Sequence, residues 1–380
     1  IEVVLERLER AGVSDVELIC AICLHRRCTP AELKHFVGAE VFRRFWPKRL
    51  YNHDAEDPQG NVVLGTTLHG EVVEINRRAA ESDLLIYVNI NLVTMDGGHK
   101  SVPVGLATYR SVRHHHNAPM MLHDSSYMDP PNSAFHRSCE RMGEVLSKQL
   151  KVFTIETTLN SNTFSSLLGF LQKREQAWNI RDRLTYHGSR LGMRALPGAL
   201  RRRAYTALPS AYGLTGVHAG ATEAVHAATL GNVDRQYEVA VPEQFDIVLV
   251  GLPSIGPYNV DSVLNPILVQ CLSTGYFFNF YRHRPLVRRG GVMIVDHPLE
   301  NEFHLVHHPS YFDFFNDLLP QTRDPAELER RFEKSYAENE WYIHLYRNSY
   351  AYHGVHPFYM WYWGAHGMAH LGKVIAVRPK

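Results

Sequence analysis

Apolar residues at the start of the chain recur with the spacing of a helix. Four of them occupy positions i, i+3, i+4 and i+7, with charged residues between them: Ile1, Val4, Leu5 and Leu8. This spacing predicts an amphipathic helix, and because the chain opens inside it we expect an earlier N-terminal segment to be missing. An apolar run over 16–22 then predicts a buried strand. Thr29, Pro30 and Glu32 supply an N-cap, a first-turn proline and a capping-box acid, so a second helix should begin there.

The alternation of helix and strand continues to the end of the chain. Predicted strands cover 72–75, 84–90, 151–156, 245–250, 292–295 and 372–377, and predicted helices cover 142–150, 169–180, 220–230 and 261–272. This order predicts an α/β fold, and 380 residues favour two domains, each with a mostly parallel sheet flanked by helices. We place the boundary at the polar stretch Val241 to Gln244. The N-terminal domain would cover 1–240 and the C-terminal domain 241–380, whose last strand could return to the first domain.

Composition narrows the class of protein. The net charge of +1 gives no reason to expect nucleic acid or a membrane surface as a partner, and the Arg201–Arg203 run is typical of a solvated helix end. We expect no signal peptide, and no apolar run reaches the roughly 18 residues that a membrane helix needs. Five cysteines, an odd number in a large chain, predict a reducing compartment and hence a cytoplasmic protein.

Cys20, Cys23, His25 and Cys28 lie within nine residues and could bind zinc or an iron–sulfur cluster. A second ligand pair at zinc-finger spacing does not follow, so the cysteines fit small core residues better. His25 and Arg26 come after a strand and before a capped helix, where α/β folds place ligand-binding groups.

His53 is followed by Asp54, Glu56 and Asp57. Carboxylates beside a histidine favour its charged form and fix its tautomer, which suits a general acid/base. The alternative is a solvated acidic loop.

Lys100 stands between Gly97-Gly98 and a proline-bearing turn, upstream of His114-His115-His116. The glycines allow close backbone approach, but the spacing is not that of a P-loop. The lysine could be a covalent attachment point or a phosphate contact. Because neighbouring side chains diverge, at most one or two of the three histidines would bind a metal.

The C-terminal run 353–370 is rich in histidine and aromatic residues. His366 and His370 are four residues apart and would share a helix face as candidate metal ligands, although no glutamate completes a metalloprotease motif. The aromatic residues indicate a core or domain interface, or the lining of a substrate pocket.

The order of these motifs resembles that of the lactate racemase family. The likeness runs over about 10–145 and includes the following residues: His25-Arg26, Thr29, Glu32-Leu33, His53-Asp54, Asp57, Leu64-Gly65, Gly70, Ile75-Asn76, Ser82-Asp83-Leu84, Gly97 to Val102, Gly105, His116, Asn132 to Met142 with His136-Arg137. The resemblance implies two α/β domains with the cofactor and active site in the cleft between them. It also implies a nickel pincer nucleotide tethered at Lys100, with His116 as nickel ligand, and soft sulfur donors with imidazole suit nickel.

The resemblance implies racemisation or epimerisation of a 2-hydroxy acid through a 2-keto acid, by reversible hydride transfer to the cofactor. His53 matches one of two base histidines, and both are needed because the hydroxyl reaches two stereochemical positions. The segment Val88 to Asp96 holds no second histidine, so Asp96, His99 or His115 would substitute, or one stereochemical outcome is handled alone.

Other site residues follow from the same resemblance. His25 and Arg26 would support the cofactor or His53, and His136 and Arg137 would contact the nucleotide phosphate of the cofactor or the substrate. The cofactor needs enzymes that make and insert it. The stretch Pro257 to Pro266 lacks the family's carboxylate-binding lysine, so the substrate need not be lactate. Asn265 and Trp361 would contact this small hydroxy acid, and a homo-oligomer is compatible with the sequence. Two alternatives stay open: a nickel or zinc hydrolase or lyase without the pincer, and a catalytically silent homologue that binds the cofactor.

Overall fold

The N-terminal unit confirms the predicted helix, strand and capped helix. The computed structural model describes residues 1–123, 125–160, 168–206, 212–254, 256–260 and 262–377. Its first elements are α1 (Glu2–Arg10), β1 (Leu18–Cys20), α2 (Pro30–Val37), α3 (Ala39–Phe45) and β2 (Leu50–Asn52). The Thr29 side chain accepts from the Glu32 amide and the Glu32 carboxylate accepts from the Thr29 amide, so α2 begins at a complete capping box. The two short strands pair in parallel.

The first large sheet has the order β5-β6-β7 and is only partly parallel. Strands β5 (Leu85–Asn91) and β6 (Val152–Asn160) run parallel, whereas β7 (Gly213–Gly220) is antiparallel to β6. Helix α11 (Thr222–Tyr237) packs against β6 and β7. An antiparallel hairpin of β3 (Asn61–Thr66) and β4 (Val72–Asn76) lies apart from this sheet.

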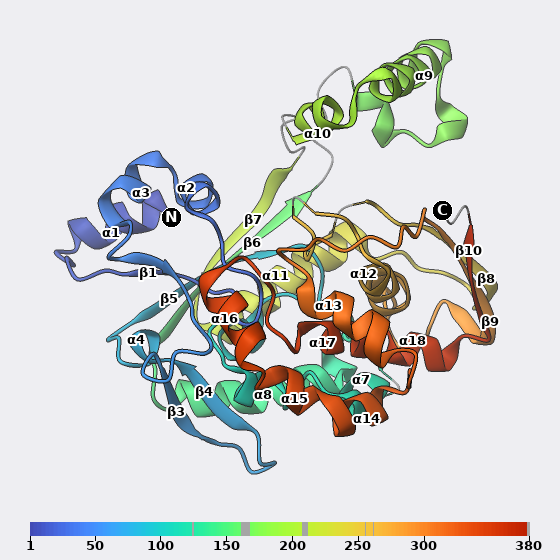
Figure 1. Ribbon diagram of the computed structural model, residues 1–380. Helices are drawn as coiled ribbons and strands as arrows, with labels where there is room; N and C mark the ends of the chain where they lie inside the picture. The colour runs from blue at the N-terminus through green and yellow to red at the C-terminus, as the bar shows by residue number, and fades with distance from the viewer. Residues whose placement is uncertain (124, 161–167, 207–211, 255, 261, 378–380) are drawn as a thin grey trace.

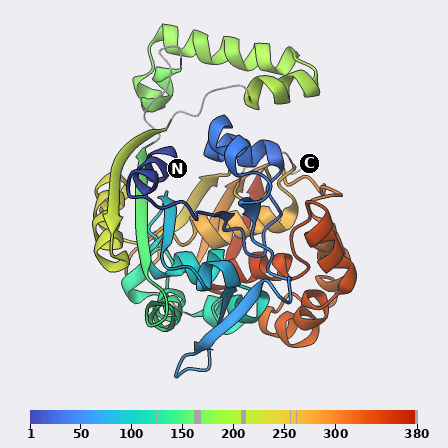
Figure 2. The same ribbon diagram turned by 90° about the vertical axis from the view of Figure 1, so that its left-hand side faces the viewer.

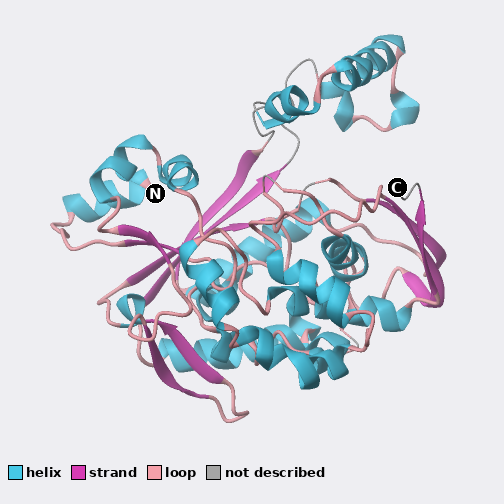
Figure 3. Ribbon diagram, viewed as in Figure 1, coloured by secondary structure: helices cyan, strands magenta, loops and turns pink. Residues whose placement is uncertain are grey.

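The second large sheet, with the order β10-β9-β8, is parallel throughout. It consists of β8 (Phe245–Gly251), β9 (Val287–Asp296) and β10 (Lys373–Val377). The last strand pairs with β9, so it does not return to the sheet of the first domain. Figure 3 shows the two sheets at opposite sides of the molecule with helices gathered between them.

Many of the remaining helices are short, and three of them continue as π-helical turns. They are α4 (Arg77–Ala80), α5 (Ser101–Gly105), α6 (Tyr109–Val112), α7 (Ala118–Leu122), α8 (Ala134–Ser147), α12 (Pro266–Gln270), α13 (Pro309–Asp313), α14 (Pro325–Leu328), α15 (Lys334–Ala337), α16 (Glu340–Asn348), α17 (His356–Trp363) and α18 (Ala365–His370). The π-helical stretches after α12, α13 and α14 are Cys271–Phe277, Phe314–Leu318 and Glu329–Glu333. None of the helices in the described ranges is long and apolar enough to span a bilayer.

One hydrophobic core joins the two halves of the chain. Leu24 and Phe135 from the first half and Tyr258 and Trp363 from the second belong to the same buried cluster. The helices α7, α12, α17 and α18 pack together within it. The division at residue 240 stays a prediction, but the core shows that residues on its two sides pack against each other.

Residues 168–206 form a projecting helical arm between β6 and β7, seen at the top of Figures 1 and 2. It contains two short 3-10 turns, Gly169–Gln172 and Glu175–Ala177, then α9 (Ile180–Ala195) and α10 (Gly198–Thr206). The helix predicted over 169–180 is therefore wrong. The Asn179 side chain accepts from the Asp182 amide in a capping box, which starts the helix where the prediction ended it. The helix predicted over 261–272 starts later, at α12, where Asn265 caps it; residue 261 lies outside the described residues.

Candidate functional site

The Gly97–Lys100 turn brings Lys100 into the interior. Gly97 and Gly98 adopt φ values of +88° and +61°, and a Cβ on Gly97 would lie 2.3 Å from the Glu156 carboxylate. The Gly98 amide donates to this carboxylate over 2.7 Å. Only glycine fits this close, left-handed turn. The Lys100 ammonium donates to the Met95 carbonyl over 2.9 Å, and its side chain is 16% exposed.

Four histidines, three of them buried, lie within electrostatic reach of Lys100. His115 and His116 lie in the turn between α6 and α7, with their Nδ1 atoms 2.6 Å apart. Burial lowers the pKa of His115 and of His136 to about 3 and that of His116 well below its ordinary value. The charge of Lys100 lowers these three pKa values further, and it also lowers the pKa of His25. The structure thus brings four predicted residues, Lys100, His116, His136 and His25, within electrostatic reach of one another.

Several polar atoms of this interior make no hydrogen bond of normal geometry in the described structure. Nε2 of His356 and the hydroxyl of Tyr359 have none, and the His115 and His136 rings have only weak contacts with the Pro103 and Met95 backbones, outside normal hydrogen-bond geometry. An unpaired buried polar atom costs about 1–3 kcal/mol, so most proteins satisfy them. Such atoms gathered near Lys100 and His116 point to a ligand.

One face of α17 forms an aromatic wall beside His116. The His116 ring centroid lies 5.4 Å from that of Tyr359 and 5.3 Å from that of Trp363. His356, Tyr359 and Trp363 are spaced i, i+3 and i+7, which places them on one side of the helix. Trp361 points elsewhere: its indole N–H donates to the Arg323 carbonyl over 3.0 Å. The wall residue is therefore Trp363 and not the predicted Trp361.

His25 and His356 form a second imidazole pair at the edge of the cluster. Their ring centroids are 5.0 Å apart, and the His25 ring is 5.4 Å from the Tyr258 ring. His356 Nδ1 lies 2.5 Å from the Tyr311 hydroxyl. His25 is exposed to solvent, although its ring contacts buried rings. The protein packed around it, with nearby positive charge, lowers the pKa of His25 to about 4.

His53 lies outside this group, with both ring nitrogens engaged. Nε2 lies 2.9 Å from the Ala107 carbonyl, to which it can only donate, and Nδ1 accepts from the Asn76 amide over 3.2 Å. Desolvation lowers the pKa of His53, and only 1% of the residue is exposed. To act as a base, His53 would have to give up a hydrogen bond.

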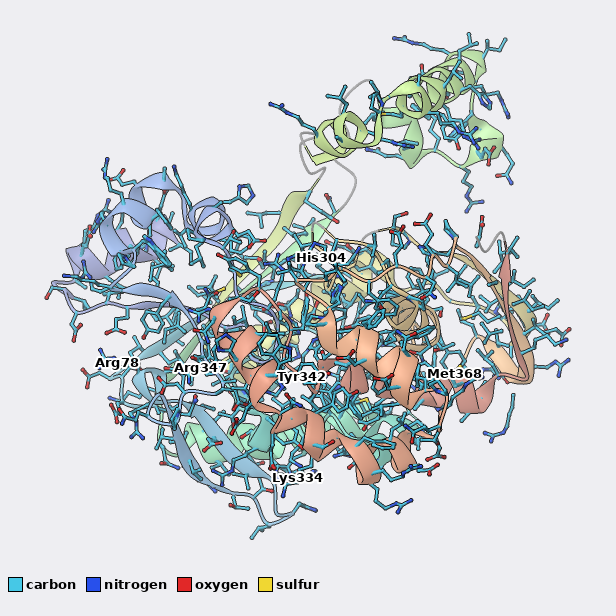
Figure 4. All side chains as sticks on the ribbon, in the orientation of Figure 1. Arg78, His304, Lys334, Tyr342, Arg347 and Met368 are labelled. Atoms are coloured by element: carbon cyan, nitrogen blue, oxygen red, sulfur yellow. The ribbon has the colours of Figure 1, made fainter. Side chains whose placement is uncertain are left out.

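The acidic loop after His53 is tied to the C-terminal part of the chain. Asp54 pairs with Arg347 over 2.9 Å, and Glu56 pairs with His353 over 3.1 Å. Arg347 is labelled in Figure 4, where it lies at the side of α16 that faces the N-terminal elements. The Asp54–Arg347 ion pair and the contact between Glu56 and His353 hold the loop against α16 and the segment before α17, so it is not freely solvated.

Four further predicted residues serve the scaffold. Arg26 forms a bidentate pair with Glu32 and holds the pKa of that carboxyl at about 2. Arg137 is exposed and donates to a backbone carbonyl, whereas its neighbour His136 points inward. Asn265 caps α12 through its side-chain oxygen and leaves its buried amide nitrogen unpartnered. Asp96 accepts from two backbone amides of its own turn and lies 3.6 Å from the Lys100 ammonium.

The cysteine and late histidine motifs are structural. Cys20 and Cys28 approach to 3.6 Å between sulfur atoms. His366 pairs with the Tyr281 hydroxyl and His370 with the Val287 carbonyl. In the described part of the chain, no group of three or more histidine, cysteine or acidic side chains is arranged to hold a metal.

Sequence reasoning missed four residues whose rings pack around His25 and His116: Tyr258, Phe135, His356 and Tyr359. The last two could have been found, because they share a helical face with Trp363. Tyr258 could not, since it reaches His25 from more than 230 positions away in the sequence.

Comparison with known proteins agrees with this arrangement. Residues 1–129 match the family described as the lactate racemase N-terminal domain. A lactate racemase from Thermoanaerobacterium thermosaccharolyticum is 26% identical over 107 residues, which cover 27% of this chain and 24% of that protein. The match thus spans about a quarter of the relative's length. The structure of lactate racemase apoprotein from the same organism superposes with a TM-score of 0.61 and 16% identity, covering 97% of this chain and 68% of that one. The superposition shows that this chain has the fold of that lactate racemase, and the family match covers its residues 1–129.

Proposed function

We propose that this chain is a nickel-pincer-nucleotide-dependent racemase or epimerase of a hydroxylated acid. The observation that carries the proposal is the position of Lys100, whose side chain is 16% exposed and lies within electrostatic reach of the buried, neutral His115, His116 and His136. A lysine in such a place is shielded from water and can form a lasting covalent link.

The residues around Lys100 fit the cofactor of the family. His116 is neutral at pH 7, so one ring nitrogen offers a lone pair to a soft metal. The described residues supply no other cluster of metal ligands here, which suits a metal whose remaining donors belong to its own cofactor. Lys100 would carry the cofactor, His116 would bind its metal, and His136 would meet a polar group of it. The same lack of a ligand cluster gives no support to a metalloenzyme without the pincer.

When bound, the cofactor supplies a reversible hydride acceptor. The chain must then move the hydroxyl proton, and His356 is placed to do so. In the tautomer whose Nδ1–H donates to the Tyr311 oxygen, Nε2 holds a free lone pair toward the cluster. His25, beside it at the solvent-exposed edge, is a second imidazole that can exchange the proton with water.

Substitution of His356 and of His53, each in its own variant, should show which of the two is the catalytic base. We expect His356→Asn to lower kcat by about 100-fold or more, because general-base catalysis is lost. His53→Asn should mainly lower the melting temperature, since His53 holds two buried hydrogen bonds. The measurement is turnover with a panel of 2-hydroxy acids and sugar acids, plain and α-deuterated, followed by chiral analysis. If the His53 variant is folded but inactive while the His356 variant is active, His53 and not His356 is the base. No turnover of any substrate by cofactor-loaded protein would refute the proposed function.

Trp363 and Trp361 offer a matched pair for the substrate wall. Trp363→Ala should raise KM about tenfold, the equivalent of about 1.4 kcal/mol of lost ring contact. Trp361→Ala removes the same side chain from the other side of α17 and should leave KM unchanged. Steady-state kinetics on the best substrate of the panel decides between them. Equal effects of the two exchanges would argue against a substrate wall on this face.

A further inference from the structure

The arm, residues 168–206, differs in charge from the rest of the molecule. It holds nine lysine and arginine residues and two acidic ones, a net charge of +7. Because the whole chain has a net charge of +1, the remainder carries −6. The arm of one molecule is therefore attracted to the body of another.

Helix α9 of this arm leaves an apolar face uncovered. Ile180, Leu184 and Leu191 are spaced i, i+4 and i+11, so they share one face, and they are 78%, 69% and 71% exposed. The opposite face is already used, because Tyr186 packs on Trp178 with ring centroids 5.2 Å apart. Three large exposed aliphatic residues in a row mark an interaction surface.

A complementary surface lies on the sheet β5-β6-β7 of the same chain. Val88, Ile90, Phe153 and Val217 are 41%, 55%, 39% and 59% exposed. The register places Ile90 and Val217 on either side of Thr157, so they lie on one face. Helix α11 packs on this sheet from the other face (Figure 2). Large apolar side chains exposed together on one face mark an interaction surface.

We propose that the chain forms a two-fold dimer in which the apolar face of α9 from each copy covers the outer face of β5-β6-β7 in the other. Such an interface is isologous and closes on itself. The arginines that flank the α9 face, Arg181, Arg183, Arg190 and Arg194, would then lie against the acidic body. A second copy fits better than nucleic acid or an anionic membrane, because one chain carries both apolar faces and both charges.

Light scattering coupled to size exclusion tests this with the full chain. At about 0.15 M salt we expect twice the chain mass of 43.4 kDa, and weaker association at about 1 M salt. Leu184→Glu with Leu191→Glu should give a monomer, as should Val88→Glu with Val217→Glu. The matched control is Ile247→Glu with Leu249→Glu, which changes residues 55% and 69% exposed on the other sheet and should leave a dimer.

Circular dichroism and the melting temperature establish that each variant is folded. If the sheet variant does not fold, copies with Leu184→Cys mixed with copies with Val217→Cys should cross-link through a thiol-reactive linker. A monomeric wild type at micromolar concentration, or an α9 variant that remains a dimer, would overturn the proposal. So would a raised mass that requires nucleic acid, seen in the absorbance ratio, or association only with anionic vesicles.

Discussion

A Lys100→Ala variant, co-expressed with the enzymes that make the cofactor, should carry no covalent adduct and lose about 10³-fold or more of its turnover. The reason is that the tether holds the reacting group in place beside the histidines, and loss of such positioning has effects of this size. Lys100 is only 16% exposed, and its amine is held by the Met95 carbonyl. Intact-mass measurement detects the adduct, and metal analysis of the same sample should show nickel only in the wild type.

A Lys100→Arg variant distinguishes the effect of the covalent tether from the effect of the positive charge. Arginine keeps a cation close to the Phe135 ring, which the Lys100 ammonium approaches at 5.9 Å, but it cannot form the same covalent link. We expect this variant to be folded, free of adduct and inactive. Lys148→Ala, at the exposed end of α8, is the control and should keep adduct and activity. Turnover by the arginine variant would show that Lys100 acts through its charge.

Local signals in the sequence predicted much of the fold. The capping box of α2 and the strands β4 to β6 and β8 to β10 were predicted near their observed positions, because their signals lie within a few neighbouring residues. The prediction of a helix over 169–180 was wrong because apolar composition alone does not show where a helix begins. The Asn179 cap sets the start of α9. The antiparallel direction of β7 depends on long-range pairing and has no local signal.

In the candidate site, too, residues fixed by local signals could be predicted, whereas those that depend on distant contacts could not. Lys100 and His116 were predicted by resemblance, and the structure brings them together. Trp361 was predicted to contact the substrate, whereas Trp363 is the residue that packs beside His116, on the face of the helix that it shares with His356. His53 depends on Ala107, more than fifty residues away, which no local pattern reveals. Arg26, by contrast, pairs with the capping-box acid six residues on, so a closer look at the sequence could have found it.

Buried histidines should make this protein sensitive to mild acid. His115, His136 and His308 are almost fully buried, and burial lowers the pKa of each to about 3. In the unfolded chain they would take up protons near pH 6.5. Because their pKa is lower in the folded state, the unfolded state binds more protons below pH 6.5. These histidines therefore cost no stability above pH 6.5, and the free energy of unfolding falls as the pH drops toward 3. At pH 5 each of these histidines costs about 2 kcal/mol.

Glu333 acts in the opposite direction and limits the loss. It is 2% exposed, and burial beside Glu329 raises its pKa to about 7. The folded state therefore binds the Glu333 proton more tightly than the unfolded state between pH 4.5 and 7. Acidification across this range raises the free energy of unfolding by up to about 3 kcal/mol. Against roughly 6 kcal/mol from the three histidines, a net loss of about 3 kcal/mol remains between pH 7 and 5. For a chain of 380 residues that lowers the melting temperature by about 4 °C.

Three variants test this balance by calorimetry between pH 7 and 5. His308→Gln keeps a donor for the Tyr258 carbonyl but does not titrate, so the melting temperature should fall less steeply with acid. Glu333→Gln keeps the contacts to Tyr109 and Tyr362 but removes the opposing group, so the fall should be steeper. His69→Gln, an exposed histidine, is the control and should follow the wild type. A melting temperature independent of pH in the wild type would mean that the interior histidines are not held neutral, and the description of His116 as a ready metal ligand would fail with it.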